Sequence, residues 1–230
     1  MKLVFKAPET RTLTIEGRDE RFPVNRIFCV GRNYAAHARE MGKDPDRDLP
    51  FFFMKPPQAI VDAAALVSIA YPPETSNYHH EIELVVAIGS GGHNIDEAAA
   101  LDHVFGYGVG LDMTRRDLQL QAREQGRPWE FGKAFSSSAP ISSLCPAQSV
   151  AHPEQGAISL QVNGETRQES DVNMLIWSVA ESIAYLSRFE TLEPGDLIMT
   201  GTPAGVGPVV TGDVMAGQID GIGSLKVTVI

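Results

Sequence analysis

The stretch Glu81-Ile82-Glu83-Leu84-Val85-Val86-Ala87-Ile88 contains the apolar run that decides the fold, a strand suited to the protein interior. Successive side chains of a strand point to opposite faces, so Glu81 and Glu83 share one face with Val85. Carboxylates are rarely buried without a partner, so the pattern alone favours the solvated polar end of an edge strand. The alternative interpretation is a buried acidic pair that requires a counter-ion.

A third carboxylate, Asp112, has a similar setting. It follows the apolar, Gly-rich run 104–111 and precedes a stretch that favours a helix from Thr114. Three oxygen ligands at strand ends, without cysteine beside them, are typical of a hard divalent cation such as Mg²⁺. The sequence therefore predicts an open metal site formed by Glu81, Glu83 and Asp112. Without a cation the three like charges repel one another, so removing one of them is expected to preserve or raise stability.

Length and charge restrict the class of protein. The 230 residues, 43% of them hydrophobic, suit one large domain or a small domain beside a larger one. With 29 acidic and 19 basic residues, the formal charge of −10 disfavours nucleic acid or an anionic membrane as the main partner. No apolar run reaches 18 residues and the first residues do not form a signal peptide, so a cytoplasmic protein is expected. Cys29 and Cys145 lack a CxxC partner and are expected to be reduced.

The chain is predicted to consist of a small N-terminal hairpin segment, 1–22, in which residues 2–5 pair with 11–15, and a main domain, 23–230. Further strands are predicted at 26–31, 51–54, 81–88, 104–111, 158–162, 196–200 and 224–230. Asn163-Gly164 is the signature of a two-residue hairpin turn. Helices are predicted at 33–41, 95–103, 114–125 and 173–188. Strands separated by Gly and Pro turns, with few inserted helices, predict a mixed α+β domain.

A candidate general base lies in the helix predicted at 33–41. His37 and Glu40 are three residues apart and therefore neighbours on one face. The carboxylate can hold the imidazole in one tautomer and raise its basicity. The same spacing is common on solvated helices, which is the alternative interpretation.

Two residues farther along the chain are candidates for binding an anionic substrate. Lys133 is flanked by Gly132 and aromatic residues rather than by other charges, which suits a partly buried ammonium group. Thr202 lies in the turn after the strand predicted at 196–200, where a hydroxyl and backbone N–H groups can face an anion. A surface position is the alternative for Lys133.

Arg116 and Gln119 lie on the helix predicted after Asp112, and their side chains point back toward the start of that helix. They are therefore candidates for a place beside Asp112, and a surface position is again the alternative. His79 shares a face with Glu81, so a ligand role toward zinc or iron is weighed against a structural or supporting role.

Taken together, these segments resemble the fumarylacetoacetate hydrolase family from about residue 26 to the C-terminus. Several motifs in a fixed order carry the resemblance: Cys29-Val30-Gly31-Arg32-Asn33-Tyr34 with His37 and Glu40, His79-His80-Glu81-Ile82-Glu83-Leu84, Gly110-Leu111-Asp112-Met113-Thr114 through Gln119, Pro128-Trp129 through Lys133, and Gly195-Asp196 through Gly207. Within the family the chain is most similar to the acylpyruvate hydrolases, and among these to the bacterial fumarylpyruvate hydrolases of gentisate breakdown.

The resemblance implies a β-rich mixed-sheet roll, usually a homodimer, that hydrolyses a carbon–carbon bond of a 2-oxo, 1,3-diketo acid such as fumarylpyruvate. It implies a metal site for Mg²⁺, with Mn²⁺ or Ca²⁺ as substitutes, held by Glu81, Glu83 and Asp112. It implies that His37 with Glu40 activates the attacking water. The other site residues it implies contact the substrate or its developing oxyanion: Lys133, which is also catalytic, Gln119 and Thr202, with Arg32 and Arg116 in support.

Two other classes of function remain open. The same metal site could serve decarboxylation of oxaloacetate or isomerisation of an unsaturated 2-oxo diacid, and neither reaction needs a hydrolytic water. The chain could also be a non-catalytic β domain stabilised by a cation, in which case His37, Glu40 and Lys133 would be incidental.

Overall fold

A computed structural model describes residues 3–35 and 48–230. These residues form four β-sheets and a few short helices, which confirms the predicted mixed α+β class. Both cysteines are buried and free, as expected from their spacing. No helix within the described ranges is long and apolar enough to cross a membrane.

The largest sheet has eight strands in the order β4-β3-β15-β8-β9-β11-β5, with β12 paired to β9. Its strands are β3 (Ile27–Gly31), β4 (Phe51–Lys55), β5 (Ile60–Asp62), β8 (Ile82–Ile88), β9 (Val104–Leu111), β11 (Ala139–Ile141), β12 (Cys145–Pro146) and β15 (Leu197–Met199). β8 pairs antiparallel with both β15 and β9, and all its residues are buried. A strand covered on both faces is expected to be an almost continuous apolar run, and β8 is one.

The two faces of β8 belong to two separate apolar clusters. Leu84 and Val86 lie in the larger cluster, which also contains residues of the second large sheet. Val85 and Ala87 lie in the other cluster, with Met199 of β15. Glu83, two residues before Val85, therefore emerges on the face that the sequence predicted, at the end of a buried strand.

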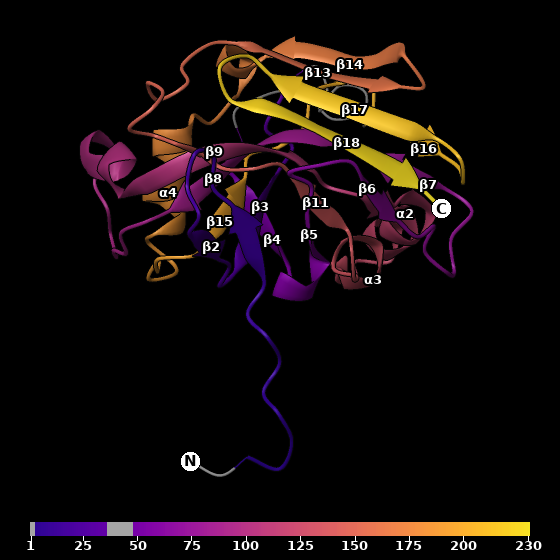
Figure 1. The fold of residues 1–230 in the computed structure, drawn as a ribbon, viewed down its shortest axis with the longest axis horizontal. Coiled ribbons are helices and arrows are strands. Elements are labelled where there is room, and N and C mark those ends of the chain that lie inside the picture. The colour runs from indigo at the N-terminus through magenta and orange to yellow at the C-terminus, as the bar shows by residue number, and fades with distance from the viewer. Residues whose placement is uncertain (1–2, 36–47) are drawn as a thin grey trace.

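A five-stranded sheet in the order β14-β13-β17-β18-β6 covers one face of the large sheet (Figure 1). Its strands are β6 (Val67–Ile69), β13 (Ala157–Val162), β14 (Glu165–Asp171), β17 (Val214–Ile219) and β18 (Gly223–Val229). Asn163 and Gly164 both have positive φ, +53° and +84°, as a type I′ turn requires. The predicted hairpin is therefore confirmed.

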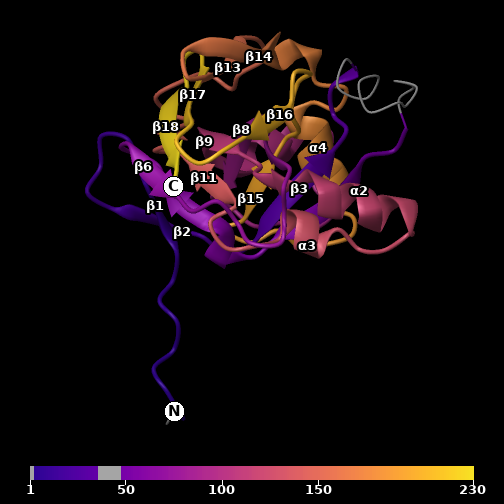
Figure 2. The same ribbon diagram turned by 90° about the vertical axis from the view of Figure 1, so that its right-hand side faces the viewer.

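The remaining elements surround these two sheets, and Figure 2 shows α2, α3 and α4 on the same side of the molecule. A three-stranded sheet contains β7 (Tyr78–His80), β10 (Thr114–Arg115) and β16 (Gly207–Val209). The helices are η1 (Pro57–Ala59), η2 (Glu97–His103), α2 (Arg116–Glu124), α3 (Glu130–Lys133), η3 (Val172–Met174) and α4 (Val179–Leu186). The helix predicted at 95–103 is thus a 3-10 helix, and most of 33–41 lies outside the described residues.

The helix predicted at 173–188 begins only with α4, at Val179. Side-chain hydrogen bonds from Asn33 hold the backbone of the segment before it. The Asn33 oxygen accepts from the N–H of Trp177 at 2.7 Å, and its amide donates to the Trp177 carbonyl at 2.8 Å. Ser178 then begins the helix with a capping box. Tertiary hydrogen bonding therefore replaces the first turns that the apolar pattern predicted.

The N-terminal hairpin uses other strands than the sequence predicted. β1 (Thr12–Thr14) pairs with β2 (Arg21–Pro23), whereas residues 3–10 are exposed and extend away from the body (Figures 1 and 2). This pairing buries Leu13 and Phe22 in the cluster that contains Val85, so it gains apolar burial that the exposed residues 3–5 do not provide. The division of the chain at residue 22 stays a prediction.

Candidate metal centre and active site

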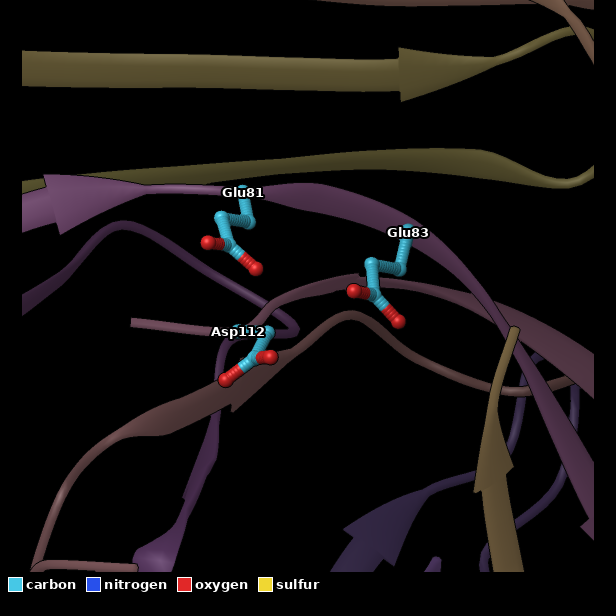
Figure 3. A group of neighbouring side chains, drawn as sticks. All are labelled: Glu81, Glu83 and Asp112. Carbon is cyan, nitrogen blue, oxygen red and sulfur yellow. The ribbon is translucent and has the colours of Figure 1, made fainter. Parts of the chain in front are cut away.

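The three carboxylates that the sequence singled out lie together in the protein interior. Glu83 lies on β8, Glu81 immediately before it, and Asp112 immediately after β9. β8 and β9 pair antiparallel, and the N–H of Asp112 donates to the Glu81 carbonyl at 2.8 Å. One carboxylate oxygen from each residue lies within 4.8 Å of the other two (Figure 3). All three side chains are buried, with exposed fractions of 4% or less.

The chemistry of this group fits a hard divalent cation. Its ligand atoms are all carboxylate oxygens, which is the preference of Mg²⁺, Mn²⁺ and Ca²⁺. Oδ1 of Asp112 is buried and accepts no hydrogen bond from the described residues. This oxygen is ion-paired with the ammonium group of Lys55, 2.8 Å away, so it already lies where positive charge is favourable.

Three basic side chains pair with two of the carboxylates, Glu81 and Asp112. Nζ of Lys133 lies 2.8 Å from Glu81 and 2.5 Å from Asp112. Arg116 pairs with the other oxygen of Glu81, and Nζ of Lys55 lies 2.8 Å from Oδ1 of Asp112. Burial lowers the pKa of Lys133, but the charges of Asp112 and Glu81 outweigh it and leave that pKa above its usual value. The ammonium group is therefore charged.

Glu83 differs from its neighbours because no basic side chain of the described residues is paired with it. Its Oε2 accepts a hydrogen bond from the N–H of Gly201 at 2.8 Å. Burial, followed by repulsion from Asp112 and Glu81, raises the pKa of Glu83 well above its ordinary value. Without a cation, Glu83 therefore favours its protonated form, and a cation that binds there must displace the proton.

Lys55 belongs to this centre although sequence reasoning missed it. It ends β4 and its side chain is fully buried. Besides approaching Asp112, it donates to the carbonyls of Lys133 at 2.5 Å and Met113 at 3.2 Å and to the hydroxyl of Ser138 at 3.0 Å. The available signal was a lone lysine that closes an apolar strand before two prolines, on the same strand face as Phe53.

Arg116 and Gln119 lie beside the carboxylates, as the sequence predicted. Nη1 of Arg116 donates to Oε1 of Gln119 at 2.5 Å. Because that bond uses the amide oxygen, the amide N–H₂ group of Gln119 is left as the donor toward the cavity that both residues line. Arg116 is itself held by Glu81, so it orders the site more than it offers a free charge to a ligand.

His79 supports Arg116 and is not part of the carboxylate group. Nε of Arg116 donates to its Nδ1 at 3.4 Å, and its Nε2 lies 2.8 Å from Oδ1 of Asn77. Burial, followed by the charge of Arg116, lowers the pKa of His79 to about 4. The imidazole is therefore neutral at pH 7, with its proton on Nε2.

Thr202 also lines the cavity, and a second residue that sequence reasoning missed holds it. Gln168, on β14 of the other sheet, donates its amide to Oγ1 of Thr202 at 2.8 Å and to the Pro203 carbonyl at 2.9 Å. Since Oγ1 accepts from Gln168, the hydroxyl proton of Thr202 is free to be donated into the cavity. Gln168 is 1% exposed and is the only fully buried residue of β14, which only the structure makes visible.

α3 reaches the carboxylates because Gly132 allows it to pack closely against α2. A Cβ atom at Gly132 would lie 2.9 Å from both the backbone N and Cβ of Gln119. This close approach places Lys133, the next residue, with its Nζ over the ring of Phe53 at 5.0 Å and against Glu81. Lys133 is 2% exposed, so it is more deeply buried than its sequence context indicated.

Arg32 lines the same cavity from the end of β3. Its φ is +58°, which is uncommon for a residue with a long side chain. The guanidinium lies 5.2 Å from the ring centre of Phe51. His37 and Glu40, the predicted base and its partner, lie outside the described residues, so their position relative to the carboxylates stays a prediction.

The cavity in front of the carboxylates is small, about 40 Å³. Glu81, Glu83 and Asp112 line it together with Lys133 and Arg116, both of which pair with Glu81. A neighbouring groove of about 490 Å³ shares several of its walls: Phe51, Phe53, Trp129 and Lys133. Carboxylates ringed by donors suit a cation together with an anionic ligand.

The family profile described as Fumarylacetoacetate (FAA) hydrolase C-terminal matches residues 26–230. The chain therefore belongs to the fumarylacetoacetate hydrolase family, as its motifs predicted.

Three individual relatives show which members of the family this chain is similar to. The crystal structure of fumarylpyruvate hydrolase from Pseudomonas aeruginosa in complex with Mn²⁺ and pyruvate matches with a TM-score of 0.96 and 59% identity, covering 100% of this chain and 99% of that one. A fumarylpyruvate hydrolase of Ralstonia sp is 51% identical over 191 residues, which is 82% of this chain and 98% of the relative. The mitochondrial oxaloacetate tautomerase FAHD1 of Homo sapiens is 43% identical over 199 residues, 86% of this chain and 89% of the relative.

Proposed function

We propose that the chain is a divalent-metal-dependent hydrolase of acylpyruvates, and that it cleaves fumarylpyruvate to fumarate and pyruvate with Mg²⁺ as its cation. The observation that carries this proposal is the buried group of Glu81, Glu83 and Asp112, ringed by donors and close to Lys133. The similarity to two fumarylpyruvate hydrolases, one solved with Mn²⁺ and pyruvate, supports it. Such a substrate places the enzyme in the breakdown of aromatic compounds.

Side chains of the cavity can bind the pyruvyl end of this substrate. A divalent cation held by Glu81, Glu83 and Asp112 would supply a Lewis acid for the oxygens of a 2-oxo acid. The amide N–H₂ of Gln119 and the hydroxyl of Thr202 are free to donate to the substrate carboxylate. Both donors are fixed in orientation by buried partners, which lowers the cost of ordering them when a substrate binds.

We propose that the carbon–carbon bond between the fumaryl and pyruvyl parts is broken by hydrolysis. In the proposed reaction His37, oriented by Glu40, takes a proton from a water molecule that attacks the carbonyl of the fumaryl group. The electrons of the cleaved carbon–carbon bond pass to the pyruvyl part, which leaves as an enolate and is then protonated at carbon. Lys133 is charged and buried beside this position, so it stabilises the developing negative charge in a medium where such stabilisation is strong.

A panel of substrates tests the proposal. We expect fumarylpyruvate to be hydrolysed with Mg²⁺, activity to disappear with a chelator, and activity to return when Mg²⁺ or Mn²⁺ is added. Oxaloacetate belongs in the panel because a relative 43% identical to this chain is an oxaloacetate tautomerase. Tautomerisation or decarboxylation of oxaloacetate without hydrolysis of any acylpyruvate would contradict the proposal in favour of that alternative, and no turnover at all would point to a binding role.

His37 offers a separate test of the hydrolytic step. We expect His37→Ala to lower acylpyruvate hydrolysis by roughly 10²-fold or more, the scale of a lost general base. Mg²⁺ affinity should hardly change, because His37 is not proposed as a ligand. Steady-state kinetics and calorimetric Mg²⁺ titration on one preparation measure both effects. Parallel loss of Mg²⁺ binding and activity, or full retention of hydrolysis, would exclude His37 as the base.

We further propose that the enzyme works in the cytoplasm as a homodimer. The dimer is implied by the family resemblance, and the cytoplasm is the location that the sequence led us to expect. Sedimentation analysis of the purified full chain measures the oligomeric state directly, and a stable monomer at micromolar concentration would contradict the dimer.

A further inference from the structure

Two arginines that line the cavity have no acidic partner in the part of the chain that the structure describes. Arg116 pairs with Glu81, but among residues 3–35 and 48–230 no carboxylate lies within ion-pair distance of Arg32 or Arg123. The chain as a whole carries a formal charge of −10, so its composition does not explain surplus positive charge in one cavity. Paired surface charges are common on such a protein, whereas unpaired guanidinium groups around a cavity form a site for an anion.

The residues of α2 that line the cavity are ordered along its length. Arg116, Gln119, Leu120 and Arg123 are spaced at i, i+3, i+4 and i+7, and all four line the cavity. Such residues share one face of a helix. At 1.5 Å of rise per residue, Arg123 lies about 10 Å along the helix axis from Arg116. Arg116 pairs with Glu81 of the proposed metal site, so Arg123 marks the far end of the cavity wall.

Apolar side chains line the region next to the two unpaired arginines. Leu120 lies one residue beyond Gln119 on the same helix face. The rings of Phe51 and Trp129 meet edge to face with centroids 5.5 Å apart, and Arg32 lies over Phe51. The cavity thus presents polar donors and carboxylates at one place, apolar walls, and unpaired guanidinium groups. This combination suits a ligand with a 2-oxo acid head, an apolar middle and a second anionic group.

We propose that Arg123, assisted by Arg32, forms a second anion site that binds the distal carboxylate of the substrate and so selects dicarboxylic over monocarboxylic 2-oxo acids. The inference rests on the proposed function for the place of the head group, at Glu81, Glu83 and Asp112. In an extended seven-carbon diacid the end carbons are about 7 Å apart, the span of two extended residues. The flexible Arg123 side chain covers the remaining distance, and its planar guanidinium can hold a carboxylate through two hydrogen bonds.

Binding of two matched ligands tests this selection without requiring catalysis. The pair is 2-oxoheptanedioate and 2-oxoheptanoate, which differ only in the terminal carboxylate, titrated calorimetrically in the presence of Mg²⁺. We expect the wild type to bind the diacid at least about tenfold more tightly, the scale of one charge-assisted hydrogen-bonded pair. Arg123→Gln should reduce that ratio to near one, and Arg123→Lys should restore part of it.

Arg127→Gln is the matched control, because it removes the same charge from an exposed position that does not line the cavity. It should keep the wild-type ratio. If Arg123 serves only as a cation near the C-terminal end of α2, Arg123→Gln lowers the melting temperature and leaves the ratio unchanged, which overturns the inference. Equal weakening of both ligands overturns it as well.

A separate measurement, the rates at which the wild type hydrolyses fumarylpyruvate and acetylpyruvate, tests the proposed function. A wild type that prefers the diacid in binding but hydrolyses neither compound contradicts the proposed function and supports the second anion site. A wild type that hydrolyses both compounds equally well, with no preference in binding, supports the proposed function and overturns the second anion site. The two inferences therefore fail on different measurements.

Discussion

Glu83→Gln is expected to abolish Mg²⁺-dependent turnover and, at the same time, to raise the melting temperature of the metal-free protein. Changes to the outer partners of a metal ligand already cost 10–100-fold in affinity or activity, so loss of a ligand should cost roughly 10²-fold or more. Stability rises because the substitution removes a carboxyl group whose ionisation is opposed by burial and by the charges of Asp112 and Glu81. The amide oxygen can still accept from the N–H of Gly201, so the gain is about 1 kcal/mol, or 2–4 °C for a chain of this size.

The pH dependence of the metal-free protein gives this prediction a second readout. The raised pKa of Glu83 means that the folded state keeps a proton that the unfolded chain loses above its ordinary value of 4.5. Folding stability from Glu83 is therefore greatest at low pH, and it falls as pH rises from about 4.5 to the raised pKa. Glu83→Gln should make the melting temperature of the metal-free protein depend less on pH in this range. In the wild type, Mg²⁺ should bind more weakly as pH is lowered through the same range, because the cation competes with the proton.

Asp112→Asn should also abolish turnover but should lower the melting temperature. From the sequence alone, removing any of the three acids relieves repulsion. The structure changes this expectation for Asp112, because Lys55 and Lys133 are buried against it and would lose a compensating charge. Glu97→Gln, at an exposed position away from the cavity, controls for loss of an acidic charge. Wild-type activity of either variant at limiting Mg²⁺ would falsify the proposed metal site.

The sequence predicted those parts of the fold that depend on local pattern. The apolar runs at 81–88 and 104–111 became β8 and β9, since a continuous apolar strand has few stable places other than the middle of a covered sheet. Asn163-Gly164 defined its hairpin because few other residue pairs accept two positive φ angles. Glu81 and Glu83 were placed correctly on the face of Val85 because strand periodicity requires it.

The sequence did not predict contacts that depend on how distant strands meet. Lys55 ends an apolar strand, which is only a weak local signal of burial, and Gln168 carries none, because each gains its partners only when separate strands pack against the site. The start of α4 was misplaced for the same reason, since side-chain hydrogen bonds from Asn33 hold the backbone that the apolar pattern assigned to a helix. In each case a polar side chain far away in sequence forms hydrogen bonds with buried polar groups, and a local sequence pattern does not predict such contacts.

Lys55→Met is expected to be among the most destabilising substitutions in the chain. It removes a fully buried charge beside Asp112 and leaves the carbonyls of Lys133 and Met113 without this donor. Breaking one side of a buried ion pair costs about 3–5 kcal/mol, although Lys133 still compensates Asp112, so we expect the lower end of that range. A loss of about 3 kcal/mol lowers the melting temperature by roughly 6–12 °C.

The response to Mg²⁺ shows whether Lys55 acts through its charge or only through packing. Lys55 neutralises Asp112 in the metal-free protein, so a cation bound there should take over part of that role. Because a ligand that binds the folded state stabilises it, Mg²⁺ should raise the melting temperature more in Lys55→Met than in the wild type. Lys226→Met, at an exposed position on β18, is the matched control. It should change neither the melting temperature of the metal-free protein nor the increase that Mg²⁺ produces. If Mg²⁺ raises the melting temperature of Lys55→Met no more than that of the wild type, Lys55 acts through packing alone. The charge of Lys55 then does not compensate Asp112.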